Sequence, residues 1–520
     1  MGKKTVVFCI FVLLIGLRST DGRESAPTLS AGQKQCRLWE PVEWSFSNAS
    51  WGGNPFDLVA KASFIHSGSG EQIKTELFYN GGSEWKLRFT GTREGVWRFV
   101  TDSADSDLDG LEGEVQVGSN PGVAGFMTKY GSKWGRLGTE KAFVPQYVMY
   151  AGPERFYKNP ARIDADIRQF LVGHGFNGFH LLVACRWFDL DKQRSNEITA
   201  AEPNPDPHTF EAIELLVRKV HAAGGVVHIW AWADAENQMA QNKWGLNGKV
   251  DQRLQRYICA RLGPLPGWSM GYGWDLQEWV DEKELRIWHQ YMHQHLGWFH
   301  FLGGRAPELT QIYDGLDYSS YQQHRPDYQI YVRAIEQFPE KPTFFEDRFR
   351  IRKGCPYGDK DYSFDQTRRG LWQSTMAGGA ANIWGNLLEA RPDGMSHPYP
   401  NRQQILTWSR FWKNRFKKDM VRDNRLTDGV CLKVPGELAV FYKEDTNSVR
   451  MDLGELSSPV RAVVVDTRRR YREIEISSLE ARPGQVFYAP RRSDWAVVVE
   501  AANRRHRDNE RSVENYNRNH

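Results

Sequence analysis

The sequence predicts a multidomain protein with a central α/β barrel and a β-sandwich on either side of it. Three observations carry this prediction. The chain has 520 residues, too many for one hydrophobic core. Strand-like and helix-like segments alternate through residues 141–417, which is typical of a parallel sheet. Short strands separated by turns fill residues 30–118 and 420–501, and these regions predict antiparallel β domains.

The first 22 residues have the pattern of a secretory signal peptide. Lys3 and Lys4 precede an apolar run from Val6 to Leu17, which is short for a membrane span. We therefore expect a secreted, periplasmic or cell-surface protein with no stable membrane insertion after signal removal. Residues 503–520 are poor in apolar side chains, and we expect a disordered tail.

Residues 30–118 alternate apolar and polar side chains in short runs, which predicts an immunoglobulin-like sandwich. The acidic loop 102–109 lacks the spacing of a calcium-binding loop, and a solvated loop is expected. The glycine-rich segment 119–140 is expected to be a linker. The five cysteines beyond the signal are far apart, which favours free thiols over a disulfide framework, although one bridge stays open.

Residues 141–417 contain eight strand–helix cycles, which match the (β/α)8 barrel and its typical length of about 250 residues. The expected strands are 143–149, 179–184, 226–234, 268–278, 299–304, 317–322, 342–346 and 380–385. The expected helices are 162–172, 209–223, 250–262, 282–296, 328–337, 365–377 and 402–416.

The high tryptophan content has two interpretations, a carbohydrate ligand or large cores, and composition alone does not separate them. The chain has 20 Trp, and indole rings stack on the flat faces of sugars, although tryptophan also fills large cores. The net charge of +4 is spread over the chain, so no nucleic-acid partner is expected. No cluster has the spacing of metal ligands, and we expect neither a catalytic metal nor a cofactor. The oligomeric state stays open.

Two carboxylates end strands that face one another across the predicted barrel. Glu278 ends strand four, between Trp274 and Trp279, and Glu346 ends strand seven. Such a pair, about 5–5.5 Å apart, performs retaining glycoside hydrolysis, in which one acid protonates the leaving oxygen and the other attacks the anomeric carbon. Each also has a structural reading: Glu278 as a helix N-terminal acid, and Glu346 as the ion-pair partner of Arg348.

With these residues in place, the chain resembles clan A retaining glycoside hydrolases, and more narrowly the apiosidase-like glycosidases. Those proteins have an N-terminal immunoglobulin-like module and a C-terminal β-sandwich of the type named collagen-binding. The stretches that carry the resemblance are 42–46, 85–89, 273–278, 342–346 and 376–385.

The resemblance implies that Glu278 is the acid/base, Glu346 the nucleophile and Trp384 a sugar platform. Gln277 stands where many clan members have the asparagine that contacts the sugar 2-hydroxyl. Asp275 is the alternative acid and Asp347 the alternative nucleophile, and since each lies in the same short segment as the first choice, the strand register decides between them.

Further side chains are expected around the pair. Trp232 and Asp234 lie on the inward face of strand three, where His228 is interpreted as a deeper core histidine, as is His180 on strand two. Tyr321 or Tyr318 can hydrogen-bond the nucleophile. The remaining candidates for substrate binding are Arg305 and Trp187.

The sequence therefore predicts a secreted retaining glycoside hydrolase that cleaves a polysaccharide or oligosaccharide. The alternative is a non-catalytic carbohydrate-binding or surface protein on the same scaffold, and a collagen- or protein-binding role for the C-terminal domain is a third hypothesis. The sugar, the linkage and endo or exo action are not predicted.

Overall fold

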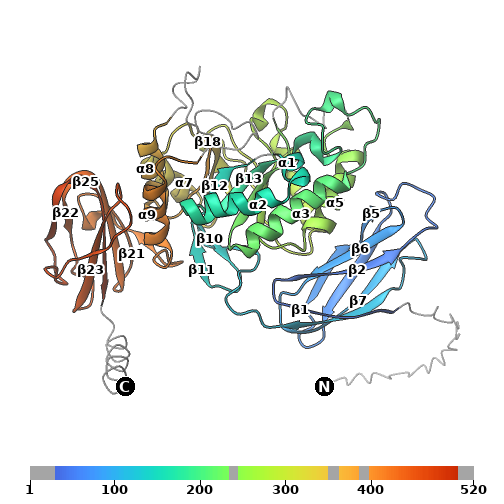
Figure 1. The fold of residues 1–520 in the computed structure, drawn as a ribbon, viewed down its shortest axis with the longest axis horizontal. Helices are drawn as coiled ribbons and strands as arrows, with labels where there is room; N and C mark the ends of the chain where they lie inside the picture. The colour runs from blue at the N-terminus through green and yellow to red at the C-terminus, as the bar shows by residue number, and fades with distance from the viewer. Residues whose placement is uncertain (1–29, 151, 234–243, 350–361, 386–397, 502–520) are drawn as a thin grey trace, which may run out of the picture.

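The computed structural model describes residues 30–150, 152–233, 244–349, 362–385 and 398–501. A barrel lies at the centre, with one β domain at each end of the long axis of the molecule (Figure 1). This architecture confirms the predicted fold class. The expected signal peptide and the expected disordered tail fall outside the described residues.

The barrel is an eight-stranded parallel sheet in the order β16-β15-β14-β13-β12-β19-β18-β17. Its strands are shorter than the sequence predicts, except for β18. They are β12 (Gln146–Met149), β13 (Gly178–Leu182), β14 (Val226–Trp230), β15 (Trp268–Gly271), β16 (Leu302–Gly303), β17 (Ser319–Tyr321), β18 (Thr343–Phe349) and β19 (Ala381–Trp384).

The two ends of this sheet, β16 and β17, close the barrel by a short seam. Asp317 N donates to Leu302 O at 3.1 Å, and Ala306 N donates to Ser320 O at 3.2 Å. A single parallel bridge joins Ala306 to Tyr321. The seam thus rests on fewer hydrogen bonds than a regular strand pair such as β13 and β14, which match along five residue pairs.

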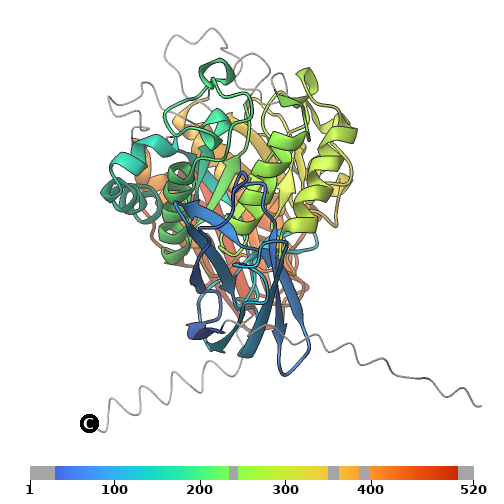
Figure 2. The ribbon, with the colours of Figure 1, turned by 90° about the vertical axis from the view of Figure 1, so that its right-hand side faces the viewer.

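Helices surround the sheet, and several of them begin at a polar cap. Asp206, Asp281 and Ser363 each accept a backbone N–H in the first turn of their helix. The helices are α1 (Pro153–Lys158), α2 (Ala161–Asp166), α3 (Pro207–Ala222), α5 (Lys249–Leu262), α6 (Glu282–His295), α7 (Tyr328–Gln337), α8 (Phe364–Met376) and α9 (Arg402–Trp412). Figure 2 shows them ringing the strands.

Two expected elements also differ from the structure in kind. The predicted helix 162–172 is α2 continued by a π-helical turn over Ile167–Val172. The predicted strand 268–278 ends at Gly271, because Asp275 adopts a left-handed conformation (φ +51°) and starts a 3-10 turn over Leu276–Glu278. Aspartate tolerates this conformation better than most residues.

The expected linker 119–140 contains strands that close the floor of the barrel. β9 (Met127–Tyr130), β10 (Lys133–Arg136) and β11 (Lys141–Phe143) form an antiparallel sheet. Trp134 is fully buried and donates its indole N–H to Thr343 O at 3.1 Å, at the start of β18. Because parallel strands start at one end of the barrel, β9 to β11 lie at its N-terminal end.

The N-terminal domain is a sandwich of a five-stranded sheet, β1-β8-β7-β3-β4, and a three-stranded sheet, β2-β6-β5. Trp44, Phe64, Trp97 and Phe99 are among the aromatic residues of its core. Its strands are β1 (Ser30–Arg37), β2 (Pro41–Ser47), β3 (Ala60–His66), β4 (Gln72–Glu76), β5 (Phe78–Gly81), β6 (Glu84–Thr90), β7 (Gly95–Ser103) and β8 (Glu112–Gly118).

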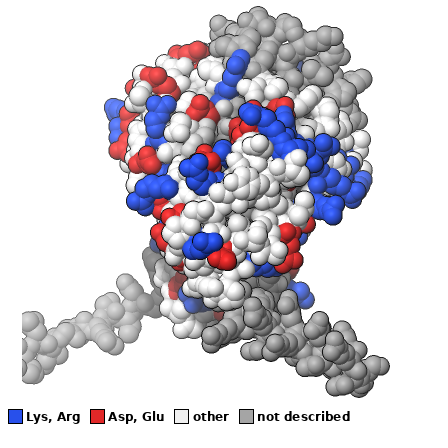
Figure 3. Space-filling view, turned by 90° about the vertical axis from the view of Figure 1, so that its left-hand side faces the viewer, with Lys and Arg blue, Asp and Glu red and all other residues white. Residues whose placement is uncertain are grey.

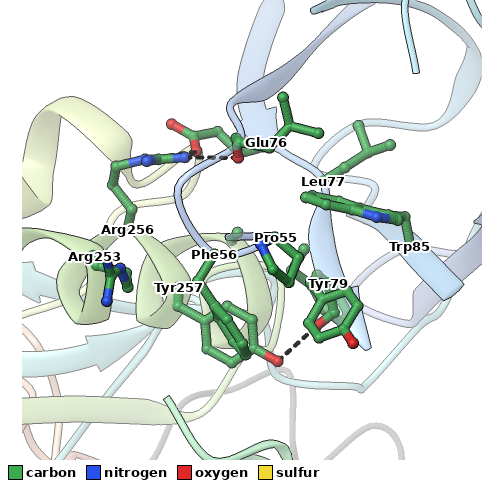
Figure 4. A pocket seen from close by; sticks show the side chains of 12 residues that line it. Pro55, Phe56, Glu76, Leu77, Tyr79, Trp85, Arg253, Arg256 and Tyr257 are labelled. Carbon is green, nitrogen blue, oxygen red and sulfur yellow. Dashed lines mark hydrogen bonds and ion pairs between the residues drawn. The ribbon is translucent and has the colours of Figure 1, made fainter. Parts of the chain in front are cut away.

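This domain is joined to the barrel through buried polar contacts. Arg88 on β6 bonds the carboxylate of Glu214 on α3 at 3.0 Å and the backbone carbonyl of Arg261, in the last turn of α5. Thr90 donates to Pro264 O at 2.5 Å. Arg256 and Glu76 form a further ion pair of the interface, and both line a small pocket beside α5 (Figure 4).

The C-terminal domain is one antiparallel sheet in the order β20-β21-β22-β25-β23-β24. The two long strands, β22 and β25, pair irregularly around Thr446. Phe441 and Val449 lie on either side of this irregularity and belong to the same hydrophobic core. The sheet therefore folds over itself. Its strands are β20 (Val421–Arg422), β21 (Val430–Val434), β22 (Leu438–Met451), β23 (Val460–Asp466), β24 (Ile474–Glu475) and β25 (Gln485–Ala501).

The C-terminal domain docks on α8. Arg368 bonds Asp494 at 2.8 Å with both side chains fully buried, and Trp372 stacks on Tyr442 at 5.2 Å. Seen from this end of the molecule, Lys and Arg side chains gather in a band on one side of the face (Figure 3).

The described cysteines, Cys36, Cys185, Cys259 and Cys431, form no disulfide bond with one another, and Cys355 falls outside the described residues. None of the helices within the described ranges combines the length and apolar character needed to cross a membrane.

Candidate active site at the barrel mouth

Glu346 lies inside the barrel on β18 and is completely buried. Its Oε1 accepts the indole N–H of Trp230 at 2.7 Å and contacts His228 Nε2 at 2.8 Å. Its Oε2 accepts the hydroxyls of Ser320 at 2.6 Å and Tyr318 at 3.1 Å. A carboxylate offers about four acceptor positions, so these four partners can fill all of them.

Gly271 at the end of β15 leaves the space that this carboxylate occupies. A Cβ atom on Gly271 would lie 1.7 Å from Glu346 Oε1, which no real structure permits. This glycine therefore allows the candidate nucleophile to approach the backbone of β15 closely. Residue 271 must remain glycine for Glu346 to keep its place.

The partners of Glu346 are themselves held by packing. His228 contacts Ser269 Oγ through Nδ1 at 2.9 Å and lies between Tyr147 and Phe344, with ring centroids 5.6 and 4.6 Å away. It is the packed core histidine that the sequence suggests, and it also holds the carboxylate. Burial, and next the charge of Glu346, raises the pKa of Tyr318, so its phenol stays protonated and donates.

A cluster of charges lies above this buried group, toward the C-terminal ends of the strands. Arg305 follows β16 and bonds both Asp275, which follows β15, and Asp347 on β18, the latter at 3.3 Å. Its guanidinium lies 5.8 Å from the ring of Trp230. Trp230 therefore stands between Glu346 and the Arg305 cluster.

The pairing of β18 with β19 is irregular between Phe345 and Arg348. This bulge includes both Glu346 and Asp347, which follow each other in sequence and are both buried. A bulge breaks strict alternation, so two successive carboxylates enter the interior of the site. Asp275 and Asp347 both bond the guanidinium of Arg305, so their carboxylates lie close to each other.

Glu278 lies on the 3-10 turn η4 after β15, and its side chain is exposed, as is that of Gln277. The turn is braced by Trp279, whose indole N–H donates to Trp274 O at 3.4 Å. Trp274 in turn packs on Trp230, with ring centroids 4.9 Å apart. Glu278 and Glu346 thus differ in environment, one in solvent and one in the barrel interior.

Four of the expected substrate-binding residues are core residues instead. Trp384 is fully buried and donates to Gln146 Oε1 at 2.7 Å, so it is not a sugar platform. Trp187 is fully buried and donates to Ala231 O at 2.9 Å. Trp232 packs near Phe188 with 2% of its surface exposed, because its strand has already ended at Trp230.

Tyr321 is the fourth, and it is the wrong tyrosine of the predicted pair. It packs against Phe345, 5.8 Å away, whereas Tyr318 reaches Glu346. The expected site residue Asp234 falls outside the described residues, as does the side chain of Arg348. Arg305 follows β16, and its role in substrate binding stays a prediction.

The sequence analysis missed two partners of the nucleophile candidate, Trp230 and Ser320. Trp230 shares the inward face of strand three with His228 at a spacing of two, and that periodicity was the available indication. Ser320 has no comparable pattern, because a serine in a buried strand is common. Among the described residues, one group has metal-ligand geometry, and it lies at the other end of the barrel: His289, His293 and Asp317.

Comparison with known proteins extends this description. Residues 35–104 match the model of a domain of unknown function, DUF5060, in the N-terminal sandwich. No curated protein sequence compared with the chain matches it. A crystal structure described as a "putative glycoside hydrolase" from Bacteroides vulgatus ATCC 8482 shares 15% identity, covering 91% of this chain and 100% of that chain, with a TM-score of 0.69.

Two further solved structures are similar to a smaller part of the chain. One, named a glycoside hydrolase, is 12% identical over 72% of this chain and 96% of its own, with a TM-score of 0.57. Another, a glycoside hydrolase family 5 protein from Bacteroides vulgatus ATCC 8482, is 12% identical over 73% and 93%, with a TM-score of 0.56. At these identities the likeness is one of fold, and the fold of this chain is shared with proteins named as glycoside hydrolases.

Proposed function

We propose that the protein is a glycoside hydrolase that acts at the C-terminal mouth of its barrel. The observation that supports this most directly is Glu346, a carboxylate held by four hydrogen-bonding partners beneath a charged mouth. The fold shared with glycoside hydrolases adds to it. The expected site for catalysis in this fold is the end at which the strands finish.

The proposed mechanism retains anomeric configuration. Glu278 protonates the leaving oxygen while Glu346 attacks the anomeric carbon, and the glycosidic bond breaks as a glycosyl ester forms. Water then attacks the anomeric carbon, gives its proton to the Glu278 carboxylate, and releases Glu346. The substrate is a polysaccharide or oligosaccharide, the enzyme is exported, and it belongs with the apiosidase-like glycosidases.

The contacts of Glu346 assign supporting roles. Hydrogen bonds from Trp230, Ser320 and Tyr318 fix the orientation of its carboxylate. Because the four partners fill its acceptor positions, one of them must move aside when an oxygen of Glu346 bonds to the sugar. A hydroxyl rotates most easily, which makes Ser320 the expected donor to leave.

The same burial favours a second candidate function. A carboxylate with no exposed surface and a full set of partners is also what a structural core residue looks like. In that case the protein is a carbohydrate-binding protein that keeps the barrel without the chemistry. The exposed Glu278 then lies in the turn before α6 without a catalytic role.

Paired substitutions separate these functions. We expect Glu346→Gln and Glu278→Gln each to lower kcat/KM by about 10³-fold or more on a glycan found by screening plant and algal polysaccharides. On a substrate with an activated leaving group, Glu278→Gln recovers the first step, whereas Glu346→Gln does not. Glu282→Gln, on the exposed first turn of α6, is the matched control.

The outcomes are distinct. If Asp275→Asn and Asp347→Asn abolish cleavage while both glutamine variants retain it, the catalytic pair is the one held by Arg305. Inversion of the anomeric configuration in the product, followed by NMR, would contradict the retaining mechanism. Binding of a glycan with no cleavage by the parent protein would favour the second function.

A further inference from the structure

Two histidines and an aspartate meet where α6 passes the seam of the barrel. His289 and His293 are one helical turn apart, so their rings lie on one face of the helix, with centroids 4.4 Å apart. His289 Nε2 lies 3.1 Å from Asp317 Oδ1, and His293 Nε2 lies 2.9 Å from Asp317 Oδ2. One ligand atom from each residue can be chosen so that all three lie within 4.8 Å of one another.

The cluster is built into the fold on its carboxylate side. Leu302 N donates to Asp317 Oδ2 at 2.7 Å, while Asp317 N donates to Leu302 O at 3.1 Å. Asp317 therefore both donates and accepts a hydrogen bond across the seam, and the bond from Leu302 N on β16 orients its carboxylate. Such outer contacts are the usual support of a metal-binding carboxylate.

We propose that His289, His293 and Asp317 form a binding site for a divalent transition-metal ion, in the first place Zn²⁺. Two imidazole nitrogens and one carboxylate oxygen are a ligand set that zinc accepts, with solvent in the fourth position. At bond lengths of about 2.0–2.1 Å, tetrahedral ligands lie roughly 3.3 Å apart. The two histidines lie 3.1 and 2.9 Å from different oxygens of Asp317, and one atom from each residue lies within 4.8 Å of the other two, so the ligand atoms must draw closer together to reach that geometry.

The surroundings favour a cation that can enter and stay. The three side chains are 14%, 24% and 13% exposed, so an ion reaches them from solvent and is then largely enclosed. His293 lies in the last turn of α6, where the helix dipole favours positive charge. Phe299 covers one side of the His293 ring, with centroids 5.6 Å apart.

The location assigns the ion a structural role. Asp317 precedes β17, and Leu302 begins β16, so the cluster lies at the N-terminal end of the barrel, away from the mouth. An ion there would tie α6 to both strands of the seam, where strand pairing is weakest. The proposal is independent of the glycosidase function, because its test measures binding and stability.

The experiment uses the full chain without any affinity tag, freed of metal by chelation. We expect one Zn²⁺ per chain in a calorimetric titration, a rise in Tm on binding, and the visible absorption of tetrahedral Co²⁺ when cobalt replaces zinc. His289→Gln and Asp317→Asn should each weaken binding by about 100-fold or more. Asn at 317 keeps an acceptor for Leu302 N, so the seam is preserved.

His208→Gln serves as the control, because His208 lies elsewhere at the surface, with 61% of its side chain exposed. It should bind zinc as the parent does. The proposal is overturned if the parent shows no saturable zinc site, or if both ligand variants bind as tightly as the parent. If Asp317→Asn proves unfolded by circular dichroism, His289→Gln alone decides the question.

Discussion

The two ends of the barrel differ in the kind of side-chain contact that each contains. At the floor, Trp134 packs with Phe301 and Phe344, at centroid distances of 4.9 and 6.1 Å, and makes one hydrogen bond. At the mouth, Arg305 holds two aspartates over a half-buried turn. The floor is stabilised by packing of aromatic rings, whereas the mouth brings buried and half-buried charges together, which costs desolvation energy.

Single strands contribute to both ends of the barrel, so the change from aromatic packing to polar and charged contacts happens over a few residues. β18 starts with Thr343 and Phe344 at the floor and reaches Glu346 two residues later. Tyr318 packs 5.5 Å from Trp134 and donates to Glu346. The floor therefore positions the candidate nucleophile, and the two ends are distinct in chemistry but continuous in packing.

The floor is expected to give the largest effect on stability. Trp134→Ala removes a fully buried indole and should cost about 3–5 kcal/mol in free energy of unfolding. Trp134→Phe keeps much of the packing and loses only the bond to Thr343 O, so its cost should be smaller. Urea unfolding measures both. Equal losses for the two variants would show that the hydrogen bond, and not the packing, maintains the floor.

Gly271→Ala tests the place where packing meets chemistry. The new methyl group would overlap Glu346 Oε1, which must shift, and a shift of about 1 Å is expected to lower kcat/KM by about 100-fold. Gly304→Ala is the matched control, since its nearest neighbour is a leucine methyl at 3.0 Å. Activity unchanged in Gly271→Ala would mean that Glu346 is not positioned for catalysis.

Asp251 tests whether a buried charge at the mouth end lowers the free energy of unfolding. It lies in the first turn of α5, on the mouth side, and burial raises its pKa to about 6. A raised carboxyl pKa stabilises the fold below about pH 4 and loses that contribution as the pH rises through 6. Asp251→Asn should therefore gain roughly 2–3 kcal/mol at pH 7 and little at pH 4. An equal gain at both pH values in urea unfolding would refute this explanation.

Tyr318→Phe should have the smallest effect, because the ring that packs against Trp134 remains. One of the four partners of Glu346 is lost, and a hydrogen bond to a charged group is worth about 1.5–3 kcal/mol. We expect kcat to fall by about 10-fold, with Tm nearly unchanged. A large fall in Tm with normal kcat would assign Tyr318 to the floor alone.

The sequence was sufficient for the fold class because periodicity and turn residues are local properties. Helix 328–337 was predicted with its observed ends, and strand 342–346 led directly to Glu346. The floor sheet was mistaken for a linker, since four-residue strands in a glycine-rich segment resemble a loop. Its packing against the barrel is visible only through the long-range contacts of Trp134.

The site was harder to predict for physical reasons. Tryptophan fills cores and binds sugars with the same side chain, so Trp384 and Trp187 could not be sorted before their burial was known. The choice between Tyr318 and Tyr321 depends on where a short strand begins. The exposed position of Glu278 follows from the left-handed backbone at Asp275, for which the sequence offered no indication.

The buried contacts of Arg88 have a consequence for how the chain can be divided. Its guanidinium, with the hydroxyl of Thr90, satisfies carbonyl groups at and just beyond the C-terminal end of α5. The first β domain thus supplies the terminal cap of a barrel helix and neutralises the carboxylate of Glu214. A shortened protein that began at the barrel would lose this cap and one of the two arginines that pair with Glu214, so we expect the sandwich and the barrel to fold as one unit.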